Sequence, residues 1–318
     1  LISLSASNRA EDPTQQGARP TLPEQNEPPV PPMRIARPVG WAGAMPTVPT
    51  GFKITALAKG LQVPRQMLVL PNGDILVAEG AGASAPALRP KDLIAGYIKS
   101  GAKSGEKGGN RITLLRDADG DGEAELRTVF IDGLNAPYGL AFVAGQLYVA
   151  NQDALLRFPY RDGQTRITER GTVLTKLPSQ INHHWTKSLA GSADGTKLYV
   201  GIGSNSNVGE RGMAIEEERA VIWEIDRLTG AHKTLVSGIR NPTALAIHPQ
   251  TRQLWAVVNE RDELGPNLVP DYLTSIRPGA FYGWPYSYWG RNIDPRVHPQ
   301  KPDMVRKAIA PDYALGSH

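Results

Sequence analysis

The chain has 318 residues, of which 33 are glycine and 27 are proline, whereas these two types together average about 12% of residues. Both types are costly inside helices, so the composition excludes a helix bundle or coiled coil and favours many short strands. The net charge is only +4, with 35 basic and 31 acidic residues interspersed, so no basic surface indicates a nucleic-acid partner.

The chain contains no cysteine, which excludes disulfides, cysteine-ligated zinc, iron–sulfur clusters and thiol catalysis. No run approaches 18 apolar residues, so no membrane-spanning segment is expected. The first residue is Leu1 rather than methionine, as in a processed mature form or part of a longer chain. A cysteine-free chain of this kind suits a periplasmic or secreted protein.

Residues 1–50 hold ten of the prolines and predict an extended, polyproline-like arm, lying on the body or leading away from a membrane anchor. Residues 51–318 are predicted to form the β domain. A Gly/Ser/Lys-rich insertion at 81–109 interrupts this domain, with a short helix expected over 90–99. Such a loop either covers a central pocket or is mobile surface.

A hairpin pattern recurs from residue 51 onward: a Gly or Pro, an apolar strand, a short Gly/Asn/Asp turn and a second apolar strand. Further strands follow each hairpin, for example over 111–115 and 220–225, which makes four strands per unit. Repeated four-stranded units indicate a β-propeller. An immunoglobulin-like sandwich is less suitable, because it would not repeat one hairpin. Four units are clear, and a fifth is expected from Phe281. The recurring segments are GLQVPRQMLVLPNGDILVAEG, GLNAPYGLAFVAGQLYVAN, HWTKSLAGSADGTKLYVGIG and GIRNPTALAIHPQTRQLWAVVN.

An acidic loop follows one of the predicted strands. Asp117, Asp119 and Asp121 alternate, and Gly122 allows the sharp turn that wraps a hard cation. Thr128 stands where an EF-hand has glutamate, so the loop is not an EF-hand. It predicts either a structural calcium site or a solvated acidic turn.

Two other segments offer groups for chemistry. His183 and His184 are adjacent, and histidine can take a proton near neutral pH; the alternative is an ordinary surface or core histidine. Arg240 and Asn241 occupy the same place in their unit as residues 134–137 in theirs, so they are expected at a similar depth along the propeller axis. A guanidinium beside an amide suits a carboxylate or quinone oxygen, unless the arginine only stabilises the loop.

Five aromatic residues crowd into 282–289, either to stack on a flat ligand or sugar or to fill core. No glycine-rich phosphate loop leads from a strand into a helix, which disfavours nucleotide cofactors. No GxSxG motif is present, so the serine-hydrolase elbow is absent.

Together these motifs resemble the pyrroloquinoline quinone (PQQ)-dependent soluble sugar dehydrogenases, and more narrowly the L-sorbosone dehydrogenase branch. The resemblance extends over most of residues 50–290. It implies a six-bladed propeller, of which this chain covers the first four to five blades, with PQQ lying flat at the axis. The matching segments are VPRQMLVLPNGDILVAE, NHHWTKSLAGSADGTKLYVGIGSNSN, GIRNPTALAIHP and FYGWPYSYWG.

The resemblance also implies roles for particular residues. His184 matches the base that removes the substrate hydroxyl proton, with His183 the less favoured candidate, while hydride passes to the quinone. Arg240 matches the arginine that polarises the quinone oxygen, and Asn241 a neighbouring PQQ contact. Tyr282 and Trp284 would form the pocket wall or its support.

The sequence departs from the family in two places. The family's Ca²⁺ lies on backbone carbonyls just after the next strand, where this chain has Arg261 and Asp262 instead of a Gly-Pro pair, so the calcium ligands there are open. The chain also stops before the family's last blade. A further C-terminal segment, in the same or a cleaved chain, is therefore expected to close the ring.

The implied activity is PQQ- and Ca²⁺-dependent oxidation of an aldose or sugar aldehyde such as sorbosone, with electrons passed to an external acceptor. Two alternatives stay open: a metal-dependent propeller lactonase, and a propeller that binds a partner or glycan without catalysis. A lactonase needs several carboxylates at the axis, whereas the axial segments here offer Arg, Asn and His.

Overall fold

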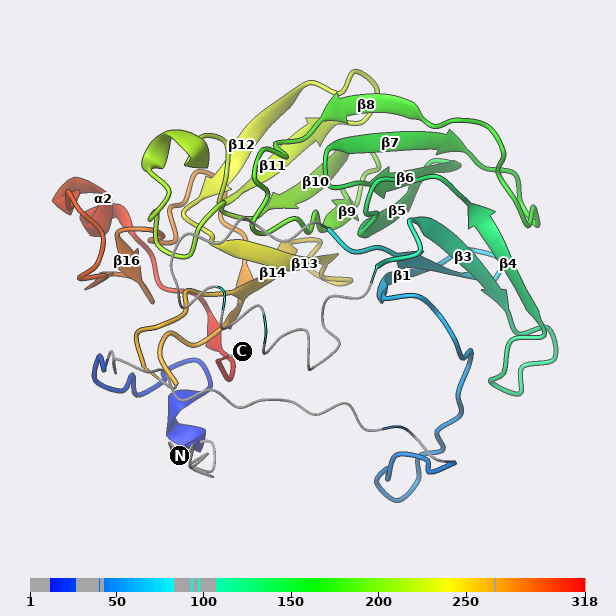
Figure 1. Ribbon diagram of the computed structural model, residues 1–318, viewed down its shortest axis with the longest axis horizontal. Helices are drawn as coiled ribbons and strands as arrows, with labels where there is room; N and C mark the ends of the chain where they lie inside the picture. Colours follow the sequence, from blue (N-terminus) through cyan, green and yellow to red (C-terminus); the bar gives the residue numbers. More distant parts are fainter. Residues whose placement is uncertain are drawn as a thin grey trace.

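The computed structural model describes residues 12–26, 40, 43–82, 93, 97, 107–265 and 267–317. Its strands form four four-stranded antiparallel sheets, which follow one another in chain order around an arc (Figure 1). The predicted all-β propeller architecture is therefore confirmed, with four blades among the described residues. The helix predicted over 90–99 lies almost entirely outside the described residues.

Each of the first three blades is a simple meander in which consecutive strands pair. The predicted hairpins and the strands that follow them form as expected. The three blades contain β1 (Pro64–Val69), β2 (Ile75–Glu79), β3 (Arg111–Arg116) and β4 (Leu126–Ile131); β5 (Gly139–Val143), β6 (Gln146–Ala150), β7 (Ala154–Pro159) and β8 (Thr172–Lys176); and β9 (Leu189–Gly191), β10 (Lys197–Ile202), β11 (Val221–Asp226) and β12 (His232–Ser237).

The fourth blade corrects the expectation of a fifth unit from Phe281. Its strands β13 (Asn241–Ile247), β14 (Leu254–Asn259) and β15 (Tyr272–Ser275) pair in order, but its outermost strand is β18 (Tyr313–Ala314). Residues from Phe281 onward instead form the short hairpin of β16 (Ser287–Tyr288) and β17 (Asn292–Ile293) and the helix α2 (Pro302–Lys307) before the chain returns. Prolines at 295, 299 and 302 break the strand pattern there.

The core lies between neighbouring blades, which explains why the inner strands read as continuous apolar runs. In β6, Leu147 and Val149 pack toward the first blade, whereas Tyr148 and Ala150 pack toward the third. Both faces of the strand are therefore buried, and alternation of side chains divides one strand between two cores. A third core of the same kind joins the third and fourth blades.

Antiparallel strands place alternate connections on opposite ends of the propeller. We call one end the site face; it carries the loops that enter each blade and the loops between its second and third strands. The opposite face carries the other turns, including the predicted hairpin turns at Gly73 and Gly195, both with positive φ. Loops of the site face span 132–138, 151–153, 177–188, 203–220, 238–240 and 260–271.

The innermost strands β1, β5, β9 and β13 line the axis, each contacting the next. A bulge between Pro242 and Ala244 interrupts the register of β13. At this bulge the carbonyl of Thr243 accepts hydrogen bonds from the Gln66 amide (3.2 Å) and the Tyr138 hydroxyl (3.0 Å). One peptide group thus joins the first, second and fourth blades at the axis.

Residues 12–26 of the N-terminal arm lie against the fourth blade. A short 3-10 helix, η1 (Pro13–Gln15), precedes Gly17, which exchanges backbone hydrogen bonds with Ala314 of β18 (3.0 and 2.8 Å). The Gln25 amide donates to the Tyr288 hydroxyl (2.9 Å). Within the described ranges, no helix has the length and apolar character to cross a bilayer.

Candidate active site on one face of the propeller

His184 and Asn241 meet at the end of β10 on the site face, although 57 positions separate them in the sequence. The backbone N–H of His184 donates to the Ser204 carbonyl (3.2 Å), and the N–H of Ser204 donates to the Arg240 carbonyl (2.8 Å). Between them, a Cβ on Gly203 would lie 2.5 Å from both the His184 Cβ and the Asn241 Oδ1. Only glycine at 203 allows the two segments to approach this closely.

The ring of His184 is held by its Nδ1 atom, which lies 2.9 Å from the Ser204 carbonyl oxygen and 3.0 Å from the Ser204 Oγ. A carbonyl can only accept, so Nδ1 carries the hydrogen. The Ser204 hydroxyl donates to the Ser206 carbonyl (2.6 Å) and therefore also accepts from Nδ1. This arrangement makes Nε2 the basic nitrogen of the neutral ring.

His183 differs from its neighbour in exposure and orientation. Its ring is exposed and lies edge-on to that of His184, with 4.6 Å between the centroids. Desolvation in the crowded loop lowers the pKa of His183, and the positive charge of Arg240 lowers it further.

A buried cationic network fixes the loop that carries the histidines. Lys187 is fully buried, and its Nζ donates to Asn182 Oδ1 and to the Trp185 carbonyl (3.0 Å each). Arg219 donates to the same Asn182 Oδ1 (3.0 Å) and to the Gln180 carbonyl (3.1 Å). Burial lowers the pKa of Lys187 well below its usual range, with the charge of Arg219 adding to the effect.

Arg240 lies beneath this surface and is almost inaccessible, with 1% of its area exposed. Its Nε and Nη2 donate to the carbonyl and Oδ1 of Asn207 (3.3 and 2.9 Å). Its Nη1 donates to the carbonyls of Asn259 (3.3 Å) and Glu260, and Nη2 also pairs with Asp262 (2.9 Å). All five N–H donors of the guanidinium therefore have protein acceptors.

The loop that the resemblance gives to calcium is held by ion pairs. Arg261 and Asp294, both buried, form a bidentate pair at 2.7 and 3.1 Å. Asp262 forms an ion pair with Arg240, which also donates a hydrogen bond to the Glu260 carbonyl. The carbonyls of Asn259 and Glu260 thus already accept hydrogen bonds from a guanidinium.

The two aromatic residues predicted at the pocket are buried and support the loops from below. Tyr282 donates its hydroxyl to the Ser275 carbonyl (2.8 Å), and its ring stacks on Tyr272 at 6.4 Å. The indole N–H of Trp284 donates to the Asn207 carbonyl (2.9 Å). Trp284 and Arg240 thus both donate hydrogen bonds to Asn207.

Glu260 is a fully buried carboxylic acid at the edge of this cluster. Among the described residues, neither of its carboxyl oxygens has a hydrogen-bond partner. Burial raises the pKa of Glu260 to about 8, against the opposing charge of Arg240. The side chain is therefore protonated at neutral pH.

We expect Glu260→Gln to raise stability relative to the wild type increasingly as pH rises from about 4.5 to 8. In this window the unfolded glutamate ionises while the folded one stays protonated, so the wild type loses up to about 1.4 kcal/mol per pH unit. Urea unfolding of both proteins across this range measures the difference. Glu217→Gln changes an exposed residue of the same face, so its plot of unfolding free energy against pH should run parallel to that of the wild type. If the plot for Glu260→Gln also runs parallel to that of the wild type, Glu260 is not a buried neutral acid.

A guanidinium from the first blade also reaches this face. Arg65, at the start of β1, donates from Nε to the Gly80 carbonyl (2.9 Å), and its Cζ lies 5.2 Å from the centroid of the Trp185 ring. Trp185 meets the Tyr138 ring edge-on at 5.7 Å. The indole next to His184 is therefore wedged between the first and second blades.

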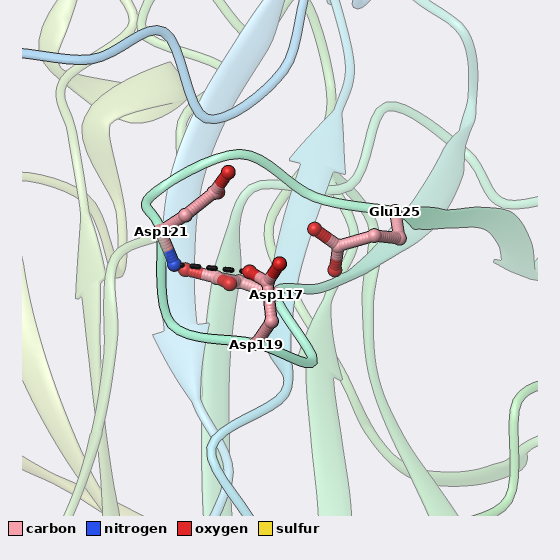
Figure 2. A group of neighbouring side chains, drawn as sticks. All are labelled: Asp117, Asp119, Asp121 and Glu125. Carbon is pink, nitrogen blue, oxygen red and sulfur yellow. Dashed lines mark hydrogen bonds between the residues drawn. The ribbon is translucent and has the colours of Figure 1, made fainter.

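The acidic loop predicted to bind calcium lies on the opposite face, between β3 and β4. Carboxylate oxygens of Asp117, Asp119, Asp121 and Glu125 lie within 4.8 Å of one another, and Figure 2 shows the four side chains gathered inside the loop. Asp117 accepts the backbone N–H groups of residues 120 and 122 (2.7 and 2.9 Å). The loop is thus far from the histidines, and calcium binding there stays a prediction.

Several residues of the site face escape sequence reasoning. Ser204 and Asn207 act through backbone and amide contacts that no short motif marks. Arg219 looks like an ordinary surface charge in the sequence but is buried. Glu260 follows an apolar strand, and this position at a strand end is the one signal that could have indicated its burial.

Comparisons with known proteins agree with the architecture. The chain superposes on the PQQ domain of pyranose dehydrogenase from Coprinopsis cinerea, at 17% identity and TM-score 0.65, covering 86% of this chain and 70% of that one. A Trichoderma reesei enzyme of carbohydrate-active family AA12 superposes at 18% identity and TM-score 0.64, covering 86% of this chain and 72% of that one. PQQ-bound aldose sugar dehydrogenase from Streptomyces coelicolor superposes at 17% identity and TM-score 0.51, covering 81% of this chain and 69% of that one. At these identities the likeness shows a shared fold.

Sequence comparison gives one further relative and a family. An uncharacterized protein of Borreliella burgdorferi is 24% identical over 197 residues, or 58% of this chain, and the match spans only half of that protein's length. The model of a domain of unknown function, DUF7133, matches residues 45–264. That range contains the first three blades and the histidine and arginine segments of the site face, and the chain accordingly belongs to the DUF7133 family.

Proposed function

We propose that the protein is a PQQ-dependent dehydrogenase that oxidises an aldose or a sugar aldehyde such as sorbosone. The observation that carries the proposal is the fixed tautomer of His184 on the site face, beside Asn241. The fold supports it, because solved propellers of the same architecture are named as PQQ-containing sugar dehydrogenases.

The side chains of this face include hydrogen-bond donors of the kinds that a flat, acidic quinone would need. Asn241 offers an amide beside His184, and Arg65 brings a guanidinium to the same face. Arg240 does not fit the role of a direct donor in this arrangement, because its five N–H groups are already bonded within the protein. Its contribution is to hold the two loops together.

The chain's own residues would perform the proton transfer. When bound, PQQ supplies a quinone carbon that accepts a hydride from the sugar carbon. Nε2 of His184 would take the proton of the hydroxyl on that carbon, which is the anomeric hydroxyl of an aldose or a hydroxyl of a hydrated aldehyde, so that its C–H and O–H bonds break as the C=O bond forms. The Ser204 carbonyl then stabilises the imidazolium through Nδ1. An external acceptor would be needed to take up the two electrons.

The test is reconstitution of the full chain with PQQ and Ca²⁺, followed by absorbance titration and dye-reduction assays with aldoses and sorbosone. A saturable PQQ absorbance shift together with sugar-dependent dye reduction is the expected result. Folded protein that shows neither would refute the proposal. Carboxylates on this face, such as Asp262 and Asp294, are engaged by arginines, so nothing here favours a lactonase.

We further propose that the acidic loop on the opposite face binds a structural Ca²⁺. Millimolar calcium should then raise the melting temperature of the EDTA-treated wild type by a few degrees, since about 1 kcal/mol of binding linkage shifts a chain of this size by about 2–4 °C. The double variant Asp119→Asn/Asp121→Asn should lose both the shift and the calorimetric binding heat.

The matched control is Asp303→Asn, which neutralises an exposed aspartate far from the loop. It should keep the full response to calcium. If the double variant responds to calcium like the wild type, the ion lies elsewhere and the loop is only a solvated turn.

A further inference from the structure

Arg65 presents a fixed guanidinium on the site face. Its Nε is bonded to the Gly80 carbonyl (2.9 Å), and its Cζ lies over the indole of Trp185 (5.2 Å). Trp185 is itself wedged against Tyr138, and a Cβ on Gly82 would lie 2.2 Å from the indole. The arginine is therefore oriented by a cation–π contact with an immobilised ring, although the residue is exposed.

Three buried arginines of this region have donors engaged by the protein. Arg240 bonds Asn207 and the fourth-blade loop, Arg219 bonds the histidine loop, and Arg261 bonds Asp294. For Arg65 the situation differs: within the described ranges, its two terminal amino groups have no protein acceptor. A planar pair of N–H donors is thus held ready to bind a ligand.

The position of this pair relates it to His184. Arg65 comes from the innermost strand of the first blade, and the indole it covers follows His184 directly in the chain. The next residue of β1, Gln66, reaches the axial carbonyl of Thr243. Arg65 therefore lies on the innermost strand of the first blade and contacts the residue that follows the proposed base.

We propose that Arg65 binds a carboxylate of the ligand through two parallel hydrogen bonds from Nη1 and Nη2. The planar fork of a guanidinium matches a carboxylate in geometry and charge, and its orientation beforehand lowers the entropic cost of binding. The inference rests on the proposed function, because the carboxylate belongs either to PQQ or to an acidic sugar substrate.

The experiment compares the full-length wild type with Arg65→Gln, Arg65→Lys and Arg252→Gln. Arg252 lies in the β13–β14 turn on the opposite face and serves as the charge-matched control. Each protein is titrated with PQQ by absorbance, and then with D-glucuronate and D-glucose by calorimetry. Melting temperature and near-UV circular dichroism show whether Trp185 stays packed.

If the carboxylate belongs to PQQ, Arg65→Gln should weaken PQQ binding by about 10–100-fold. The PQQ affinity of Arg65→Lys should lie between those of the wild type and Arg65→Gln, because lysine keeps the positive charge but lacks the planar pair of N–H donors. Wild-type affinity should also drop with salt more steeply than that of Arg65→Gln. If the carboxylate belongs to the substrate, PQQ binding is unchanged and the preference for glucuronate over glucose disappears in Arg65→Gln. Either result supports the inference.

Unchanged affinity for both PQQ and glucuronate in a folded Arg65→Gln protein would overturn it. A loss shared equally by Arg252→Gln would overturn it as well, because the effect would then reflect net charge. If the wild type binds no PQQ but binds glucuronate through Arg65, the proposed function fails while the carboxylate site stands. If the wild type binds neither, both fail.

Discussion

Replacing His184 by alanine is expected to reduce turnover of the PQQ-loaded enzyme by about 10²–10⁴-fold, the usual contribution of a positioned general base. The substituted side chain is the one whose tautomer the Ser204 carbonyl fixes. Affinity for PQQ should stay within a few-fold of the wild type, because the imidazole is assigned to the substrate proton. Dye-reduction rates and PQQ titration on the same samples measure the two quantities.

The adjacent histidine supplies a matched control. His183→Ala removes an identical side chain one position away, exposed and without the Ser204 contact, and should keep most of the activity. The opposite pattern, with His183→Ala inactive and His184→Ala active, would reverse the assignment of the base. Equal loss in both variants would point to disruption of the whole loop rather than to proton transfer.

Replacing Arg240 by leucine is expected to destabilise the folded protein by about 3–5 kcal/mol, because buried acceptors lose a charged hydrogen-bond donor at a cost of about 1–3 kcal/mol each, whereas Asp262, which is 49% exposed, loses little. The change removes five hydrogen bonds that join the Asn207 loop of the third blade to the fourth-blade loop at 259–262. Each acceptor would lose one hydrogen bond, and the Glu260 carbonyl would lose it in a buried position. Denaturant unfolding followed by circular dichroism measures the loss.

An exposed ion pair of the same length tests whether burial is the reason. Arg277 and Asp312 also lie 2.9 Å apart, but the arginine side chain is 57% exposed, against 1% for Arg240. Arg277→Leu should therefore cost about 1 kcal/mol or less. Similar losses in the two variants would show that Arg240 is not the clamp between the blades.

The blades could be predicted because each depends on local signals. Apolar strands of four to six residues with a Gly or Asn-Gly turn between them specify a hairpin wherever they occur, so the units starting at Gly60, Gly133 and Gly238 formed as expected. The segment from Phe281 shares the apolar character but not the turns. The closing strand of the fourth blade, β18, lies more than 30 residues after β15, with which it pairs, and no local pattern encodes that pairing.

The depth of Arg240 and Asn241 along the axis could be inferred from equivalent positions within repeats, whereas His184 is assigned to the same site only through the family resemblance. What these side chains bond to could not be inferred. Arg240 looks like a ligand donor in the sequence, and only the folded loops show that Asn207 and the carbonyls of the fourth blade take its N–H groups. The exposure of Arg65 likewise depends on packing against an indole from another blade.

The bulge in β13 bears on how relatives of this protein should be compared. The acceptor that gathers Gln66 and Tyr138 is the main-chain oxygen of Thr243, which every amino acid possesses. Position 243 can therefore vary among homologues without loss of the junction, and an alignment column there would look uninformative. The trace left in evolution would be paired retention of an amide at 66 and a phenol at 138, together with the extra residue that creates the bulge.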